Sequence, residues 1–308
     1  MTARGSHVAG YELCELLGTG GTGDVYATRS PSGGRELVIK ILNESAEWPA
    51  PHALLVQEGY AGEQVRHRNI VSMVEYGVTP DSTAYVVMER ARGTSLGEWI
   101  RAKGLPSLQT IRAIAHQLLS GLAAIHEAGM IHGDMKSDNV LVDDEGHVTI
   151  IDLGLARCAG APPAGCREDV VPGTPAYMAP EVIMGSPAGP EADLYAVGIV
   201  LYEMLTGTTP FAGGTMDAVL RRQLEDHVVP ASLRFPARPH CRSLDRVIER
   251  VLAKQPKRRY RDALELAAAI DGAIPQDDSE RLVGAEPGTP STTAPTRSFV
   301  RPRALGTR

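Results

Sequence analysis

IHGDMKSDNVLVDDEGHVTIIDLG, residues 131–154, is the most informative segment of this chain. It carries Asp134, Lys136, Asn139 and Asp152 in order, beside two short apolar strands. Phosphoryl transfer uses these residue types: one carboxylate receives or orients a hydroxyl proton, a cation neutralises the phosphoryl group, and an amide and a second carboxylate hold Mg²⁺. The segment therefore favours a phosphoryl-transfer site over a polar surface loop.

Two upstream segments fit the same chemistry. In GTGGTGDV, residues 18–25, the glycines allow a strand, turn and strand to lie over phosphates. A dinucleotide-binding loop would lead into a helix, whereas DVYA continues as a strand. Lys40 ends the apolar run LVIK and can grip a phosphate, although an ordinary edge charge is the alternative. Glu58, on the next predicted helix, is the carboxylate expected to hold Lys40.

The apolar spacing divides the chain into two parts. Strand-like runs separated by Gly-rich breaks lie at 11–17, 24–30, 36–42, 70–78 and 84–90, with a helix predicted at 52–66. Helical spacing starts at Leu96 and, around a strand-rich block at 138–152, recurs at 107–129, 193–207, 215–227, 243–254 and 260–270. The pattern predicts a small β-rich lobe followed by a large helical lobe, joined near Glu89 to Thr94.

Composition excludes several classes of protein. The 308 residues are 43% hydrophobic and 22% charged, which excludes wholesale disorder, and the net charge of −6 gives no reason to expect a nucleic-acid partner. With no signal peptide and no run of about 18 apolar residues, we expect no membrane span and a cytoplasmic location. The four cysteines are too few and too scattered for a disulfide framework or a zinc site: Cys14, Cys158, Cys166 and Cys241.

The two ends of the chain differ from its middle. Residues 1–10 are small and polar, and we expect a flexible start. Residues 273–308 are rich in Pro, Ser, Thr and Arg without a hydrophobic period, so we predict a disordered tail. Its hydroxyl residues either receive phosphate and recruit a reader domain, or belong to an inert end. The folded domain is predicted at 11–272, with lobes at about 11–90 and 91–272.

From Tyr11 to Gly272 the chain resembles Hanks-type serine/threonine protein kinases of bacteria. The motif H-R-D-x-K-x-x-N stands here as HGDMKSDN, and D-F-G as DLG; A-P-E occurs at 179–181, D-x-W-x-x-G as DLYAVG at 193–198, and P-x-x-R-Y as PKRRY at 256–260. The resemblance implies an α+β, two-lobed kinase fold. The small lobe has an antiparallel sheet with one main helix, and the large lobe is mainly helical. It also implies transfer of the ATP γ-phosphate to a protein Ser or Thr.

The resemblance also implies roles for individual residues. Lys40 binds the α and β phosphates and pairs with Glu58. Asp134 is the catalytic base, Lys136 contacts the γ-phosphate, and Thr174 bonds the base and lines the hydroxyl site. Asn139 and Asp152 hold Mg²⁺, with Mn²⁺ as an alternative ion, while Arg259 pairs with Glu181. Met88 is the gatekeeper, and Glu89 and Ala91 present backbone groups to adenine. The implied nucleotide-binding residues are Gly18, Thr19, Gly20, Gly21, Thr22, Gly23, Val25, Val38, Lys40, Met88, Glu89, Ala91 and Leu141.

Two departures from the family concern packing. Val38 replaces an alanine and narrows the adenine pocket, while Tyr195 replaces a tryptophan, which we interpret as packing alone. His132 has no His or Cys partner at ligand spacing, so we expect it in the core and not at a metal.

A third departure concerns the helix that carries Glu58. This helix also carries Gly59 and Gly62, and a mid-helix glycine costs about 1 kcal/mol relative to alanine. Gly62 stands where the family places a large apolar residue of its internal spine, so we expect a gap there. We further expect Glu58 to be loosely held until a partner or a homodimer contact orders the small lobe, and Gly62→Leu to raise activity.

A fourth departure predicts unusual regulation. Gly133 replaces the arginine that grips a phosphorylated activation loop, and residues 153–180 contain no Ser and one Thr, Thr174. We therefore expect that loop phosphorylation does not activate this protein. Its own packing, Arg157 or Arg167, or a partner must order the loop instead.

Two competing functions stay open. Aminoglycoside-type small-molecule phosphotransferases also carry the motif H-G-D-x-x-x-x-N. A protein substrate, docked as a peptide, is favoured by Lys136, the GTPAYMAPE segment and Asp193 to Gly198. A pseudokinase scaffold is the non-enzymatic alternative, and the complete catalytic set argues against it.

Overall fold

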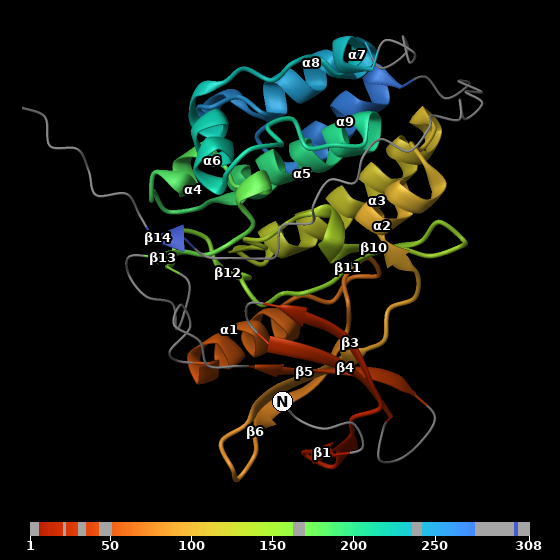
Figure 1. Ribbon diagram of the computed structural model, residues 1–308, viewed down its shortest axis with the longest axis vertical. Helices are drawn as coiled ribbons and strands as arrows, with labels where there is room; N and C mark the ends of the chain where they lie inside the picture. Colours follow the sequence, from red (N-terminus) through yellow and green to blue (C-terminus); the bar gives the residue numbers. More distant parts are fainter. Residues whose placement is uncertain are drawn as a thin grey trace, which may run out of the picture.

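The computed structural model describes residues 6–20, 23–29, 35–42, 51–162, 170–235, 242–274 and 299–300. They form two lobes, a smaller one built on a β-sheet and a larger helical one, so the predicted fold class is confirmed (Figure 1). Gly21, Thr22, Arg167, Cys166, Cys241 and nearly all of the predicted tail lie outside the described residues.

The small lobe contains a five-stranded sheet in the order β3-β4-β5-β7-β6, and each neighbouring pair is antiparallel. One helix, α1, packs against β6 and β7. A short hairpin of β1 and β2 precedes the sheet. The bounds are β1 His7–Val8, β2 Tyr11–Glu12, β3 Glu15–Gly20, β4 Gly23–Arg29, β5 Glu36–Leu42, α1 Pro51–Gln64, β6 Met73–Val78 and β7 Ala84–Glu89.

Strand alternation in this sheet positions the first site residue. Ile39 of β5 and Val87 of β7 are fully buried on one face, in the cluster under the N-terminal hairpin. Leu42 packs on the opposite face with Leu55 of α1. Because successive side chains of a strand point to opposite faces, Lys40 shares the face of Leu42 and is directed toward α1.

The large lobe is built around α5, most of whose residues are apolar and buried. α3 and α8 pack against it, and α9 packs against both α3 and α8. Ser107 begins α3 by accepting a hydrogen bond from the Thr110 amide. The helices are α2 Leu96–Lys103, α3 Leu108–Glu127, α4 Pro180–Ile183, α5 Pro190–Thr206, α6 Met216–Glu225, α7 Ala231–Arg234, α8 Arg242–Val251 and α9 Ala263–Ala273.

Several short elements connect the lobes and frame the site. β10 (Val140–Val142) pairs with β11 (Val148–Ile150) and with β8 (Thr94–Ser95), while β9 (Met130–Ile131) pairs with β12 (Arg157–Cys158). β13 (Val170–Val171) pairs with β14 (Phe299–Val300). In the sequence, only the block containing β10 and β11 was predicted, because a two-residue strand has no readable period. Within the described part of the chain, no helix has the length and hydrophobicity to cross a membrane.

Candidate active site

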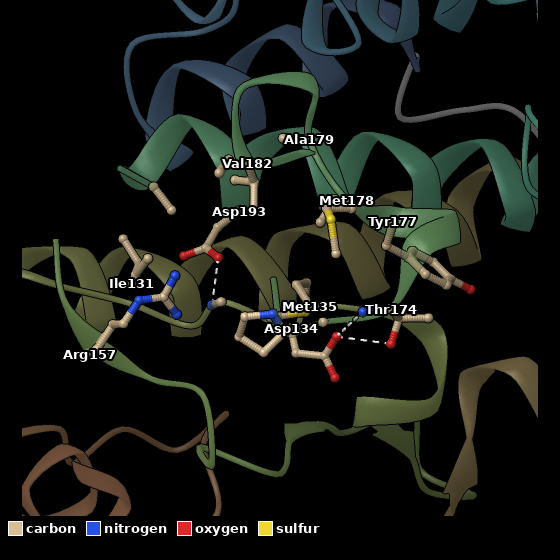
Figure 2. A pocket seen from close by; sticks show the side chains of 16 residues that line it. Ile131, Asp134, Met135, Arg157, Thr174, Tyr177, Met178, Ala179, Val182 and Asp193 are labelled. Carbon is tan, nitrogen blue, oxygen red and sulfur yellow. Dashed lines mark hydrogen bonds between the residues drawn. The ribbon is translucent and has the colours of Figure 1, made fainter. Parts of the chain in front are cut away.

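The carboxylate of Asp134 lies at the centre of a buried polar cluster. Its Oδ1 accepts hydrogen bonds from the amide and the hydroxyl of Thr174, each at 2.9 Å (Figure 2). Its Oδ2 lies 3.0 Å from Nζ of Lys136, which also donates to the Thr174 hydroxyl at 3.1 Å. The predicted contact between Thr174 and Asp134 is confirmed. The three residues hold one another in fixed positions beneath the activation segment.

Asn139 and Asp152 fit a divalent cation. Asn139, in the 3₁₀ turn Ser137–Asn139, donates its amide Nδ2 to the Asp134 carbonyl at 2.8 Å, and this bond does not use its amide oxygen. Asp152 uses Oδ1 to accept from Lys40 at 2.7 Å and from the Gly154 amide at 3.2 Å. Within the described residues this leaves its Oδ2 as an oxygen ligand, the kind that Mg²⁺ prefers.

Lys40 lies between two carboxylates. Its Nζ is 3.1 Å from Oε2 of Glu58 and 2.7 Å from Oδ1 of Asp152, and both Lys40 and Glu58 are buried. Burial alone would lower the pKa of Lys40, but the charges of Asp152 and Glu58 outweigh it and raise that pKa. Burial alone would raise the pKa of Asp152, whereas Lys40 holds it well below its usual value. Lys40 is therefore a permanent cation, held by α1 of the small lobe and by the loop after β11.

Gly59 and Gly62 of α1 allow close packing against β6, whereas a gap at Gly62 was expected. A Cβ at Gly62 would lie 2.4 Å from Cε and 2.9 Å from Cβ of Met73, and a Cβ at Gly59 would lie 2.5 Å from the ring of Tyr76. Both glycines therefore allow α1 to approach β6 closely. The predicted gap at Gly62 is wrong, because Met73 fills that space. The pair of Glu58 and Lys40 is closed in this structure, and the expectation that Glu58 is loosely held until a partner orders the small lobe stays a prediction.

Arg157 occupies the space beside Gly133. Gly133 has a φ of +81°, and a Cβ there would lie 2.6 Å from Nη1 of Arg157. Arg157 is buried and donates to the carbonyls of Leu155 at 2.8 Å and Ala161 at 3.0 Å. These two bonds, made within the activation segment (residues 153–180), support Arg157 as one of the groups that order it.

Asp193 holds the catalytic loop, residues 132–139, in place through hydrogen bonds to its backbone. It is buried at the start of α5 and accepts hydrogen bonds from the amides of His132 at 2.8 Å and Gly133 at 2.9 Å. His126 Nε2 lies 2.9 Å from its Oδ2. Burial alone would raise the pKa of Asp193, but His126 and the Gly133 amide lower it. The interpretation of Asp193 as part of a peptide-docking surface is corrected, since it supports the loop that carries Asp134. His132 is fully buried, as predicted.

A second supporting network lies beside the loop that carries Asp134, and no motif in the sequence predicts it. The hydroxyl of Tyr177 donates to Oε2 of Glu203 at 2.7 Å and lies 2.9 Å from Oγ of Ser137. Burial raises the pKa of Tyr177, so the phenol stays neutral and keeps this hydrogen bond. The network ties the segment after Thr174 to α5 and to the catalytic loop. No local motif indicates it, because its members are 26 and 40 positions apart.

A pair of buried charges anchors the end of the activation segment. Arg259 donates to both carboxylate oxygens of Glu181, at 2.6 and 2.7 Å, which confirms the predicted pair. The guanidinium of Arg259 also lies 4.7 Å from the ring centre of Tyr195. Tyr195 has more than the packing role expected of it, since its hydroxyl donates to Gln223 at 2.5 Å.

Most of the implied nucleotide-binding residues lie on strands of the small lobe. Val38 on β5 pairs in register with Met88 on β7, and Glu89 ends β7 just before Ala91. The others that the structure describes are Gly18, Thr19 and Gly20 on β3, Gly23 and Val25 on β4, and Leu141 on β10.

Between the loop that carries Asp134 and the activation segment lies a small cavity of about 30 Å³, lined by Asp134, Gly133, Arg157, Thr174, Met178, Val182 and other residues (Figure 2). Space of this size suits a water molecule better than a nucleotide. Of the cysteines described, Cys14 and Cys158 are free thiols.

Comparisons with known proteins agree with this geometry. Residues 11–268 match the family described as "Protein kinase domain". A protein of Corynebacterium glutamicum named "Probable serine/threonine-protein kinase PknB" is 33% identical over 84% of this chain and 41% of its own length. The serine/threonine-protein kinase PknA of Mycobacterium tuberculosis is 32% identical over 92% of this chain and 64% of its own length.

A solved structure shares the fold. A crystal structure of a double mutant of the Mycobacterium tuberculosis PknI kinase domain covers 89% of this chain and 99% of its own, with a TM-score of 0.68 and 22% identity. The chain spans 41% to 64% of the length of the two curated relatives. By the match over most of its length, this chain belongs to the protein kinase family.

Proposed function

We propose that this chain transfers the γ-phosphoryl group of ATP to a Ser or Thr hydroxyl of a protein in the cytoplasm, with Mg²⁺ or Mn²⁺ as the ion. The observation that carries the proposal is the buried cluster of Asp134, Lys136 and Thr174, together with the Lys40–Glu58–Asp152 ion pairs. Both named relatives are serine/threonine kinases, which supports the same substrate class.

The described side chains divide the work of this reaction among them. Asp134 receives the proton of the attacking hydroxyl, and the hydrogen bonds from Thr174 keep its carboxylate in one orientation. Lys136 and Lys40 place positive charge where the phosphates lie. Asn139 and Asp152 would hold the divalent ion, which neutralises phosphate charge when it is bound. Val38, Met88 and Leu141 would enclose the adenine.

The competing functions have less support. A small-molecule phosphotransferase explains the HGD spelling, but gives no reason for Thr174 to be bonded to both Asp134 and Lys136. A pseudokinase gives no reason for a buried Lys40 to be paired with Glu58. The activating partner on the small lobe was inferred from Gly59 and Gly62, and it loses that support because both glycines fit β6.

Replacing the proposed base tests this function. Asp134→Asn should lower kcat by about 10²- to 10⁴-fold, because the proton acceptor is lost, while thermal-shift titration still detects ATP binding. Asp144→Asn is the matched control, since Asp144 is fully exposed in the turn between β10 and β11. Full turnover in Asp134→Asn, or an equal loss in the control, would reject Asp134 as the base.

A further inference from the structure

The C-terminal tail contributes a strand to the activation segment. β14, Phe299–Val300, runs antiparallel to β13, Val170–Val171, with Val300 opposite Val170 and Phe299 opposite Val171 (Figure 1). Among the described strands, β13 pairs with β14 alone. This pairing joins two segments that are about 130 positions apart in the sequence, so local propensity does not produce it.

β13 lies next to the proposed site of the substrate hydroxyl. Val171 precedes Thr174 by three residues, and Thr174 is bonded to Asp134. Three residues of extended chain span at most about 10 Å. A peptide with its hydroxyl at Asp134 therefore brings its neighbouring residues to β13. An extended peptide gains affinity by adding a strand to an open sheet edge, which is the position that β14 takes.

The sequence around the two strands favours this pairing. Glu168 and Asp169 precede Val170, whereas Arg301 and Arg303 follow Val300. Opposite charges in the sequences that flank two antiparallel strands favour their pairing.

The chain between α9 of the large lobe and β14 tethers β14 to the lobe that carries β13. Residues 275–298 separate α9 from β14 in the sequence, and a generic chain of that length has a root-mean-square span of about 27 Å. Such a tether gives an effective concentration in the millimolar range. A contact of only millimolar affinity would then be formed in roughly half of the molecules.

We propose that β13 is the peptide-docking edge of this protein and that the segment at Phe299–Val300 of the same chain occupies it. A protein substrate must displace this segment, so the tail raises the apparent KM for protein without changing the chemical step. The inference rests on the proposed kinase function, and it identifies the substrate as an extended segment that pairs along β13.

The test replaces the paired dipeptide in the full chain. In the variant Phe299→Asp/Val300→Asp, two acidic residues enter opposite β13 and its acidic flank. In the matched control Leu282→Asp/Val283→Asp, the same change is made to an apolar dipeptide elsewhere in the tail. With dephosphorylated casein as the probe, the first variant should lower the KM for casein about twofold, because the tail occupies β13 in about half of the wild-type molecules, with kcat and the KM for ATP unchanged. The control should match the wild type.

Hydrogen exchange separates docking from catalysis. The amides of Val170 and Val171 should exchange faster in the Phe299→Asp/Val300→Asp variant than in the wild type or the control, whether or not casein is phosphorylated. Unchanged exchange would overturn the docking. Faster exchange with an unchanged KM, or with a lower kcat, would overturn the competition and indicate that the tail orders the segment. If neither the wild type nor either variant phosphorylates casein, the kinase proposal fails, while the exchange result still decides whether the tail docks on β13.

Discussion

Enlarging Gly62 should destabilise the small lobe, because Met73 already occupies the space beside it. A Cβ at Gly62 would lie 2.9 Å from Cβ of Met73, and the thioether end of Met73 would lie closer still. The thioether can rotate away, but the Cβ of Met73 moves only with its strand. Gly62→Leu must therefore push α1 away from β6 and carry Glu58 away from Lys40.

The size of the effect follows from two opposing contributions. Removing a mid-helix glycine stabilises a helix by about 1 kcal/mol, whereas overpacking a filled site costs about 1–3 kcal/mol. Gly62→Ala should lower the free energy of unfolding by about 1 kcal/mol, and Gly62→Leu by about 2 kcal/mol. Adding Met73→Ala to Gly62→Leu empties the space for the new side chain. The double variant should then recover about 1–2 kcal/mol relative to the sum of the single changes.

Urea unfolding and steady-state phosphotransfer measure the two consequences. Gly272→Ala is the matched control, because Gly272 lies in α9 and a Cβ there would meet no described atom within 4 Å. That change should stabilise the protein by about 0.5–1 kcal/mol. Gly62→Leu should also lower kcat, because α1 carries Glu58. If Gly62→Leu alone is as stable as the wild type and more active, Met73 does not fill the site and the reasoning fails.

The activation segment, Lys254 and the Arg259–Glu181 pair each give a further prediction. Phosphatase treatment should leave kcat within about twofold, because the segment from 153 to 180 has no Ser and its one Thr is bonded to the proposed base; a steady-state assay with mass spectrometry checks this, and a large loss traced to a site there would contradict it. Burial lowers the pKa of Lys254 to about 8, so between pH 8 and 10.5 the unfolded chain binds the extra proton and stability rises with pH. Between pH 7 and 9.5 in urea unfolding, the free energy of unfolding of the wild type should therefore rise by about 1 kcal/mol relative to that of Lys254→Met. Relative to the exposed control Lys257→Met it should not rise. Arg259→Met should lower the free energy of unfolding by about 3–5 kcal/mol, because Glu181 stays buried without its bidentate partner; a loss under 1 kcal/mol in urea unfolding would show that the pair is not structural.

The sequence predicted elements and pairs that depend on local spacing or on a motif. The long helical period at 107–129 matches α3 at Leu108–Glu127 to within two residues at each end. Pairs such as Arg259 with Glu181 and Thr174 with Asp134 came from the resemblance, and both are formed.

The predictions that failed, and the strand pairing that was not predicted, depend on contacts between distant segments. The contact between Gly62 and Met73 is set by how α1 lies on β6, and no period in either segment encodes that fit. The pairing of β13 with β14 involves two residues on each side, too few for a strand pattern. Asp193 belonged to a motif that was found, but its partners are backbone amides 60 and 61 positions away, and side-chain types do not reveal them.

The most direct test of the proposed function is transfer of radiolabelled γ-phosphate from ATP, with phosphoamino-acid analysis of the product. The wild-type chain is given dephosphorylated casein in one reaction and a panel of aminoglycosides in another. We expect label on phosphoserine and phosphothreonine of casein, none on the aminoglycosides, and loss of the label in Asp134→Asn. Label on an aminoglycoside with none on casein, or equal labelling of casein by Asp134→Asn, would contradict it.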